Sequence, residues 1–535
     1  MYSTLFRGAT VVDGSGEPPF HADLAVVDGL IAEIAPTITA SAKRIIDARG
    51  TVLAPGFIDI HGHSDMTLFT YPGLESKAFQ GVTTEVTGNC GLGAFPVAEG
   101  RKEVLAEFLR LHDFLLPPDG LTWSDLAGYA RRIDGQGLGI HLAPLVGHGA
   151  LRIAAMGMDD RSPTTKELAM MSSLLETALL QGAWGISTGL IYPPGSYAAT
   201  DELITLAKTV AGHHALYATH MRSESEGLFP ALEEAITISR ASGVRVQVSH
   251  LKALGSSNRG EGKRLLATLA KAVAAGVDIA ADQYPYEASA TTLTAVVPAW
   301  AHGGGVAALL DRLRNPELRG RLTEEIGREI EAREGASRIM VVGCRSAQNR
   351  GFSGKSLATV AVARGCSPAE AVLRLLGEEE GSVSAVFFSM APEDVTAILA
   401  DPLVAVGSDG HALHAADSAG EVTHPRSYGT FPRVLGRYVR DEKLLSLSAA
   451  IRKMTAIPAG RLGFTRRGML LPGYAADLVL FDPVTIGDPA TYRDPHRYAT
   501  GVIHLLVDGR FVISDGALTG ERPGRLLRKR SNHAS

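Results

Sequence analysis

Between residues 57 and 408 short apolar segments alternate with longer helical stretches, and few folds accommodate such a repeat. The alternation is typical of parallel β-strands joined by crossover helices. We therefore predict an α/β fold whose centre is a (β/α)8 barrel of the TIM type. The candidate strands are Phe57–Ile60, Thr83–Thr87, Leu142–Val146, Gly185–Thr188, Leu216–Thr219, Val244–Ser249, Val277–Asp282, Ala385–Phe388 and Val404–Ser408.

These nine segments are one more than a barrel requires. Either Ala385–Phe388 lies outside the barrel or an earlier assignment is wrong, and the spacing does not decide between the two. Charged helix formers are dense from Arg312 to Arg333. We interpret that density as an inserted helical subdomain at about residues 300–345, whose role the sequence does not indicate.

The sequence pattern at the two ends of the chain differs from the pattern in its middle. Turn-forming Asp-Gly pairs separate short β-branched runs near the N-terminus, and a similar pattern returns around Asp477–Phe481. At 535 residues the chain is long enough for a second, smaller domain beside the barrel. We predict that residues 1–55 and 466–535 pair into one β-sandwich, and that residues 56–465 form the barrel and its insertion.

Composition, charge and cysteine content argue against several classes of protein. The net charge of −5 is mild, which argues against a nucleic-acid partner, and no apolar stretch is long enough to cross a membrane. The N-terminus lacks the basic and apolar regions of an export signal. Cys90, Cys344 and Cys366 are too few for a disulfide framework. We therefore expect a cytoplasmic protein, and its oligomeric state stays open.

Several candidate strands end in residues that bind metals. His61 and His63 follow the first strand two residues apart, so both rings point the same way on an extended chain. His220, His250 and Asp409 end three later strands. The carboxyl ends of barrel strands meet at one rim, so the five side chains are expected to converge there. Imidazole and carboxylate groups are common zinc ligands, and we predict a metal centre.

Longer strings around these residues carry a resemblance to a known family. The segment from Gly56 to His63, together with His220, His250 and Asp409, resembles the amidohydrolase superfamily over nearly the whole chain. Four further strings resemble its N-acyl-D-amino-acid deacylases, also called D-aminoacylases. They are Gly81-Val82-Thr83-Thr84-Glu85-Val86-Thr87-Gly88-Asn89-Cys90-Gly91, Thr219-His220-Met221-Arg222-Ser223-Glu224, Tyr284-Pro285-Tyr286 and His424-Pro425-Arg426-Ser427-Tyr428-Gly429-Thr430-Phe431.

The resemblance implies a ligand set for zinc. It places the Cys90 thiolate among the ligands, where most relatives use a carboxylated lysine, and the segment Gly185–Gly189 at the end of the fourth candidate strand indeed contains no lysine. It further implies that one zinc ion is held tightly by Cys90, His220 and His250. A weaker second position would involve His61, His63 and Asp409, and whether one or two metals are functional stays open.

The expected chemistry is hydrolysis of an N-acyl-D-amino acid to a carboxylate and a D-amino acid. Zinc lowers the pKa of a bound water to about 7, so the expected nucleophile is a metal-bound hydroxide. Asp409 is predicted to accept the water proton and to return it to the leaving amine, in addition to binding metal. The preference for the D-configuration rests on the resemblance alone, and the acyl group and side chain stay open.

The substrate of such an enzyme is a small molecule with a free carboxylate. Lys252, Arg222 and Arg426 are candidates to bind that carboxylate, because cationic donors pair with it. Tyr284 is a candidate hydrogen-bond donor to the oxyanion, and Ser289 would assist it.

Two other classes of function compete with this interpretation. One is a different amidohydrolase, acting on cyclic amides as hydantoinases do or on dipeptides, and the missing lysine argues against the cyclic-amide enzyme. The other is a barrel that has lost its catalytic function and serves as a scaffold. The complete set of candidate ligands argues against a scaffold.

Overall fold

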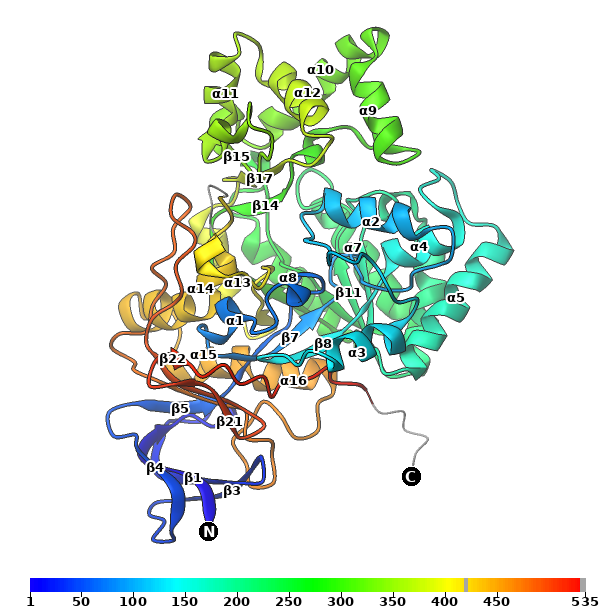
Figure 1. The fold of residues 1–535 in the computed structure, drawn as a ribbon. Helices are drawn as coiled ribbons and strands as arrows, with labels where there is room; N and C mark the ends of the chain where they lie inside the picture. The colour runs from blue at the N-terminus through cyan, green and yellow to red at the C-terminus, as the bar shows by residue number, and fades with distance from the viewer. Residues whose placement is uncertain (418–421, 530–535) are drawn as a thin grey trace.

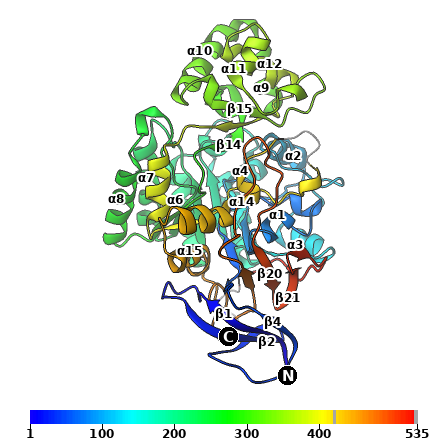
Figure 2. The ribbon, with the colours of Figure 1, turned by 90° about the vertical axis from the view of Figure 1, so that its left-hand side faces the viewer.

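The protein, described by a computed structural model over residues 1–417 and 422–529, has three stacked parts (Figure 1). A β-sheet from the two ends of the chain lies at one end, the barrel lies in the middle, and the insertion lies at the other end. A view turned by 90° has the same order of parts (Figure 2). Among the described residues, no helix combines the length and the apolar character needed to cross a membrane.

The barrel strands form two parallel arcs in the described part of the chain. Strands β6, β7 and β8 make one arc, and β9 to β13 with β18 make the other. Most of their residues are buried, as expected for parallel strands that are covered on both faces. The strands are β6 (Phe57–Asp59), β7 (Val82–Thr87), β8 (His141–Pro144), β9 (Val146–Gly147), β10 (Gly185–Gly189), β11 (Leu216–His220), β12 (Arg245–Val248), β13 (Ile279–Gln283) and β18 (Val404–Val406).

Backbone contacts join the two arcs at both of their edges. At one edge the backbone N–H of Asp409 donates to the carbonyl of His61 over 2.7 Å, next to a parallel bridge between Gly62 and Gly410. At the other edge the N–H of Trp184 donates to the carbonyl of Pro144 over 2.9 Å. These contacts bring the last strand beside the first.

Helices follow the strands and cover the outside of the barrel (Figure 1). Local sequence explains where they begin: in the capping box of α5, the Thr164 hydroxyl accepts from the N–H of Glu167, and the Glu167 carboxylate accepts from the N–H of Thr164. The helices are α1 (Glu75–Ala78), α2 (Lys102–Leu111), α3 (Leu126–Asp134), α4 (His148–Met156), α5 (Thr165–Leu180), α6 (Thr200–Gly212), α7 (Leu228–Ser242), α8 (Gly262–Ala274), α13 (Pro392–Ala400), α14 (Arg426–Arg433), the π-helix η9 (Val434–Asp441), α15 (Leu447–Met454) and α16 (Ala456–Leu462).

The two ends of the chain share one nine-stranded sheet. Strand β5 pairs antiparallel with β19, and this pairing is the seam between the N-terminal and C-terminal segments. Leu24, Leu53, Leu480 and Leu506 contribute to a buried core that draws on both segments. The strands are β1 (Tyr2–Val11), β2 (Phe20–Val27), β3 (Leu30–Ala35), β4 (Ala42–Asp47), β5 (Val52–Pro55), β19 (Leu478–Phe481), β20 (Val502–Val507), β21 (Arg510–Ser514) and β22 (Ala517–Leu518).

The insertion is larger than the sequence predicts. It runs from β14 to β17, so the predicted bounds of about 300–345 are too narrow. Strand β17 contains most of Ala385–Phe388, which therefore lies outside the barrel, in an antiparallel sheet with a core of its own beneath the helices. Its elements are β14 (Ser289–Thr292), β15 (Ile339–Val342), β16 (Lys355–Ser356), β17 (Ser384–Phe387), α9 (Val306–Arg314), α10 (Pro316–Ala332), α11 (Leu357–Ala363) and α12 (Pro368–Glu378).

Candidate metal centre

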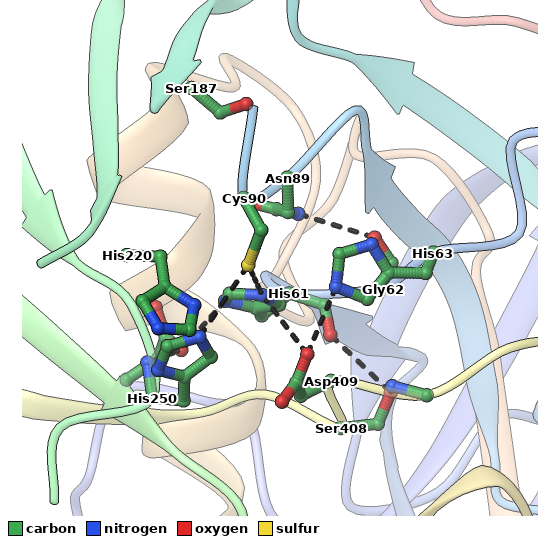
Figure 3. A network of polar contacts seen from close by, with 12 residues as sticks. His61, Gly62, His63, Asn89, Cys90, Ser187, His220, His250, Ser408 and Asp409 are labelled. Carbon is green, nitrogen blue, oxygen red and sulfur yellow. Dashed lines mark hydrogen bonds and ion pairs between the residues drawn. The ribbon is translucent and has the colours of Figure 1, made fainter. Parts of the chain in front are cut away.

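Four metal-binding side chains converge at the carboxyl ends of the barrel strands (Figure 3). His61 follows β6, Cys90 follows β7, His250 follows β12 and Asp409 follows β18. One potential ligand atom from each lies within 4.8 Å of the others, and all four residues are buried. The convergence of His61, His250 and Asp409 was predicted from their positions at strand ends, the resemblance implied Cys90, and the structure brings the four side chains together.

The contacts among these side chains are short. The Cys90 Sγ lies 3.3 Å from the His61 Nε2 and 3.5 Å from the His250 Nε2. The Asp409 Oδ1 lies 2.9 Å from the His63 Nε2 and 3.4 Å from the His61 Nε2. The side chain of His63 therefore joins the group through Asp409.

His220 belongs to a second group, with Glu224 and His250. Its ring packs edge-on against that of His250, with ring centroids 4.3 Å apart (Figure 3). The ring nitrogens of His220 are buried and have no hydrogen-bond partner, and the same is true of the His63 Nδ1. Buried polar atoms are normally satisfied, so these nitrogens fit a metal that completes the centre. Thiolate, imidazole and carboxylate donors together suit zinc.

The electrostatics of the centre favour ligands in their metal-binding forms. Burial favours the neutral thiol of Cys90, but the rings of His61 and His250 outweigh it and hold the pKa of the thiol well below its usual value. Burial likewise opposes ionisation of Asp409, but the Arg426 guanidinium and the His250 ring outweigh it and hold the pKa of Asp409 well below its usual value. Both shifts favour the thiolate and the carboxylate, which are the forms that bind a metal.

Three of the converging residues have an unusual backbone. Cys90, His250 and Asp409 adopt φ angles of 55°, 36° and 52°. This is the left-handed region, which residues other than glycine seldom occupy and which costs on the order of 1–3 kcal/mol. At these three positions, backbone strain coincides with residues that point functional groups into the centre.

Sequence analysis did not find the residues that orient these ligands. The Asp282 carboxylate lies 3.1 Å from the His61 Nδ1, and the Glu224 carboxylate lies 3.0 Å from the His250 Nδ1. Each carboxylate fixes the orientation of an imidazole whose other nitrogen faces the centre. Glu224 stands in one of the strings that carry the family resemblance, so that string was the available signal for it.

A buried charge cluster beneath the centre was also missed. The Lys77 ammonium donates to the Asp59 carboxylate over 2.7 Å and to the Ser408 hydroxyl over 2.6 Å. The Glu85 carboxylate lies 3.6 Å from the same ammonium. Burial disfavours the charge of Lys77, but Asp59 and Glu85 outweigh it and raise the pKa of the ammonium. The cluster is charged and lies between strands that carry the ligands.

A cavity of about 490 Å³ opens above the centre and is bounded by the insertion. Lys252, Tyr284, Ser289 and Arg426, all predicted to contact substrate, line it. The charged groups of Lys252 and Arg426 lie 5.6 Å and 4.9 Å from the centre of the Tyr284 ring. The Tyr284 hydroxyl is buried without a hydrogen-bond partner, which leaves it able to donate to a ligand.

Two of the predicted cations already have anionic partners. The Arg426 guanidinium lies 2.7 Å from the Asp409 carboxylate, and the Lys252 ammonium lies 2.6 Å from that of Glu224. Arg222 lies apart: it is bonded to Glu234 and to two backbone carbonyls, and it does not line this cavity. The structure therefore brings Lys252 and Arg426 to the centre, whereas Arg222 stabilises a neighbouring loop.

Comparison with known proteins identifies relatives over almost the full chain. The sequence pattern of the amidohydrolase family matches residues 44–513. An N-acyl-D-aspartate deacylase of Alcaligenes xylosoxydans xylosoxydans is 37% identical over 98% of this chain and 94% of its own length. A crystal structure of an N-acyl-D-glutamate deacylase from Bordetella bronchiseptica, in complex with zinc and a phosphonate that mimics the tetrahedral intermediate, is 36% identical. It superposes with a TM-score of 0.82 and covers 98% of this chain and 99% of that one. A D-aminoacylase with a binuclear metal centre is 34% identical over 99% of this chain and 100% of its own, with a TM-score of 0.83.

Proposed function

The chain belongs to the amidohydrolase family and, within it, to the N-acyl-D-amino-acid deacylases, and from this membership we propose that it hydrolyses N-acyl-D-amino acids to a carboxylate and a D-amino acid. The observation that carries the proposal is the convergence of Cys90, His61, His250 and Asp409 beneath a cavity whose wall includes Lys252 and Arg426. Such a cavity suits a substrate with an amide next to a carboxylate.

The residues that would hold zinc are those of the converging groups. We propose that Cys90, His220 and His250, of which His250 contacts the other two, hold one ion tightly. His61, His63 and Asp409, of which Asp409 contacts both histidines, would offer a second, weaker position. When bound, zinc supplies Lewis acidity, which acidifies water and polarises a carbonyl. The unpartnered ring nitrogens of His220 support its place among the ligands.

Asp409 is the candidate acid–base residue. Its carboxylate is buried, its pKa is held well below the usual value, and it contacts the rings of His61 and His63. It accepts the proton of the attacking water and returns it to the amide nitrogen, which must be protonated before the C–N bond breaks. The contact with Arg426 keeps the carboxylate charged until the proton arrives.

The remaining polar groups bind and orient the substrate. We assign the α-carboxylate of the amino acid to Arg426 and Lys252, because both cations face the cavity beside Tyr284. Tyr284 donates its unpaired hydroxyl to the developing oxyanion, with Ser289 beside it on β14.

A cyclic-amide hydrolase of the hydantoinase kind is less well supported. Strand β10 ends in Ser187-Thr188-Gly189 and supplies no lysine, and Cys90 stands among the ligands in its place. A cytoplasmic location stays a prediction, which the three unpaired cysteines support.

A hydrolysis screen tests the proposal. The protein, loaded with zinc, is offered N-acetyl derivatives of methionine, aspartate and glutamate in both configurations, together with hydantoins and dipeptides. We expect release of free D-amino acids and no comparable rate with the other substrates. Preferential turnover of an L-compound, a hydantoin or a dipeptide contradicts the proposal. The Asp409→Asn variant is the control for contaminating hydrolases.

A further inference from the structure

A second cavity of about 600 Å³ adjoins the first. It lies between α2, the segment that follows β10, and the insertion, which stands over α2 in both views (Figures 1 and 2). Its volume falls within the range of small-molecule binding sites. Nothing in the hydrolytic chemistry described above uses this space.

The two cavities share one stretch of wall. The residues that line both of them are His112, Ile191, Tyr192, Glu224, Leu254, Ala295 and Arg333. The Tyr192 ring packs edge-on against the ring of His220 at 5.0 Å on one side and against that of His112 at 4.8 Å on the other. Tyr192 therefore stands at the boundary, with the metal centre on one side and the second cavity on the other.

The wall of the second cavity combines apolar side chains with charged ones, of which Arg101, Glu107 and Asp159 are exposed and Glu224 is paired with Lys252. Its apolar side chains come from α2, from the end of β10 and from the insertion, namely Val104, Phe108, Leu190, Val297, Val306 and Leu309. The two buried histidines in the wall are uncharged at neutral pH, because burial lowers the pKa of both His112 and His302 to about 4. The guanidinium groups of Arg222 and Arg333 are paired with Glu234 and Glu329. Such a wall suits an uncharged, flexible chain.

Lys252 and Arg426, the candidates to bind the substrate carboxylate, lie at the first cavity and set the direction of the substrate. Lys252, Arg426, Tyr284 and Ser289 line the first cavity and not the second. A substrate whose carboxylate lies against Lys252 and Arg426 has its amide at the metal centre. Its acyl group then extends away from the cations, toward Tyr192 and the space beyond it.

We propose that the second cavity binds the acyl chain of the substrate, and that the protein favours D-amino acids carrying an unbranched acyl chain longer than acetyl. The proposal rests on the deacylase function proposed above and names the substrate class within it. Burial of each additional methylene against the wall is expected to raise kcat/KM about fourfold, until the chain fills the cavity.

A chain-length series tests the proposal on the wild-type enzyme. The same D-amino acid is supplied with acetyl, butanoyl, hexanoyl, octanoyl and decanoyl groups, and kcat/KM is measured for each with the zinc-loaded protein. We expect a rise with chain length followed by a plateau. A flat or falling series alongside good hydrolysis of the acetyl compound overturns the acyl site and leaves the deacylase function intact. Absence of hydrolysis throughout the series overturns both.

Two matched variants on α2 test whether the dependence of kcat/KM on acyl-chain length arises in the second cavity. Val104→Trp fills the cavity from a half-buried position, and Arg110→Trp places the same side chain on the exposed face of the same helix, outside both cavities. We expect Val104→Trp to lower the ratio of decanoyl to acetyl kcat/KM at least tenfold, and Arg110→Trp to leave that ratio unchanged. If the two variants behave alike, the second cavity does not bind the chain.

A second series separates the acyl group from the amino-acid side chain. N-Acetyl derivatives of D-alanine, D-norvaline and D-norleucine are compared in the wild type and in Val104→Trp. We expect their relative rates to be the same in both proteins. If Val104→Trp changes this series and not the acyl series, the cavity binds the side chain and the assignment is overturned.

Discussion

The Lys77 ammonium lies 2.7 Å from the Asp59 carboxylate, and both side chains are fully buried. The pair lies directly beneath the strand ends that carry two of the ligands. The Asp59 carboxylate accepts hydrogen bonds from the N–H groups of His61 and Ser408, over 3.2 Å and 2.8 Å. Because Ser408 precedes Asp409, the ion pair links β6 to β18 and fixes the separation of the two ligands.

Replacement of Lys77 is expected to destabilise the protein strongly. Lys77→Met leaves the Asp59 charge buried and unpaired, which typically costs about 3–5 kcal/mol. Adding Asp59→Asn removes that charge and is expected to recover part of the loss. Urea unfolding of the wild type, the single variant and the double variant measures both effects. A loss below about 1 kcal/mol in Lys77→Met would show that the pair is not needed for stability.

The three cysteines are expected to differ in their importance for metal binding. Cys90→Ala removes a thiolate from the centre, so zinc content and turnover should both fall sharply. Cys344→Ala is the matched control, because burial raises the pKa of the Cys344 thiol to about 12 and keeps it protonated. Cys366→Ala, in the insertion, is a second control. Zinc content and turnover are measured on the same samples. Equal zinc content and turnover in the three variants would remove Cys90 from the ligand set.

Asp409→Asn is expected to lower turnover by a factor of about 10² to 10⁴, the usual contribution of a positioned acid–base group. The amide has nearly the same shape but cannot accept the proton of water. Loss of the ion pair with Arg426 is expected to reduce the affinity for substrate by a smaller factor than the variant reduces turnover. Metal content must be determined on the variant, because loss of zinc would imitate the effect. A zinc-loaded Asp409→Asn enzyme with wild-type turnover would contradict the assigned role.

Acid is expected to destabilise the insertion through His302. Its pKa is about 4 in the folded protein, lowered by burial from 6.5. Between these values the unfolded chain binds a proton that the folded chain does not, so the free energy of unfolding falls as the pH falls. From pH 7 to pH 5 this group accounts for a loss of about 2 kcal/mol.

The variant His302→Gln isolates that contribution. It keeps a donor near the Val297 carbonyl, which the His302 ring nitrogen contacts over 3.4 Å, and it does not titrate. We expect the wild type to lose about 2 kcal/mol more than the variant between pH 7 and pH 5, measured by urea unfolding of metal-free protein. Identical pH profiles would show that His302 is not the titrating group.

The parts of the site that follow from strand topology were predictable. His61, His220, His250 and Asp409 lie at or just after strand ends, and a barrel brings such positions together whatever its loops do. Cys90 needed the family resemblance as well, because a lone cysteine is usually a small core residue. The central barrel was also predictable, since its buried strands alternate with helices along the chain.

Other features depend on contacts that no local pattern records. Lys77 is on a four-residue helix, where a lysine is ordinarily solvated, and only the folded chain brings Asp59 and Ser408 to it. The insertion was underestimated because β14 and β15 are short and each pairs with β17, which follows them after intervening helices. The sequence also does not reveal that Arg222 forms an ion pair with Glu234, which lies on the helix that follows it along the chain. This ion pair holds the Arg222 side chain against a loop and not at the metal centre.

The left-handed backbone at Cys90, His250 and Asp409 has an evolutionary consequence. Glycine is the residue that adopts such angles without penalty, so replacing any of the three by glycine removes a ligand and relaxes the metal-free chain by on the order of 1–3 kcal/mol. The backbone thus gives these positions no protection against glycine, whereas the buried ion pair with Arg426 still protects Asp409. In a descendant protein that is no longer selected for catalysis, we expect glycine to replace Cys90 and His250 early, while the barrel fold persists.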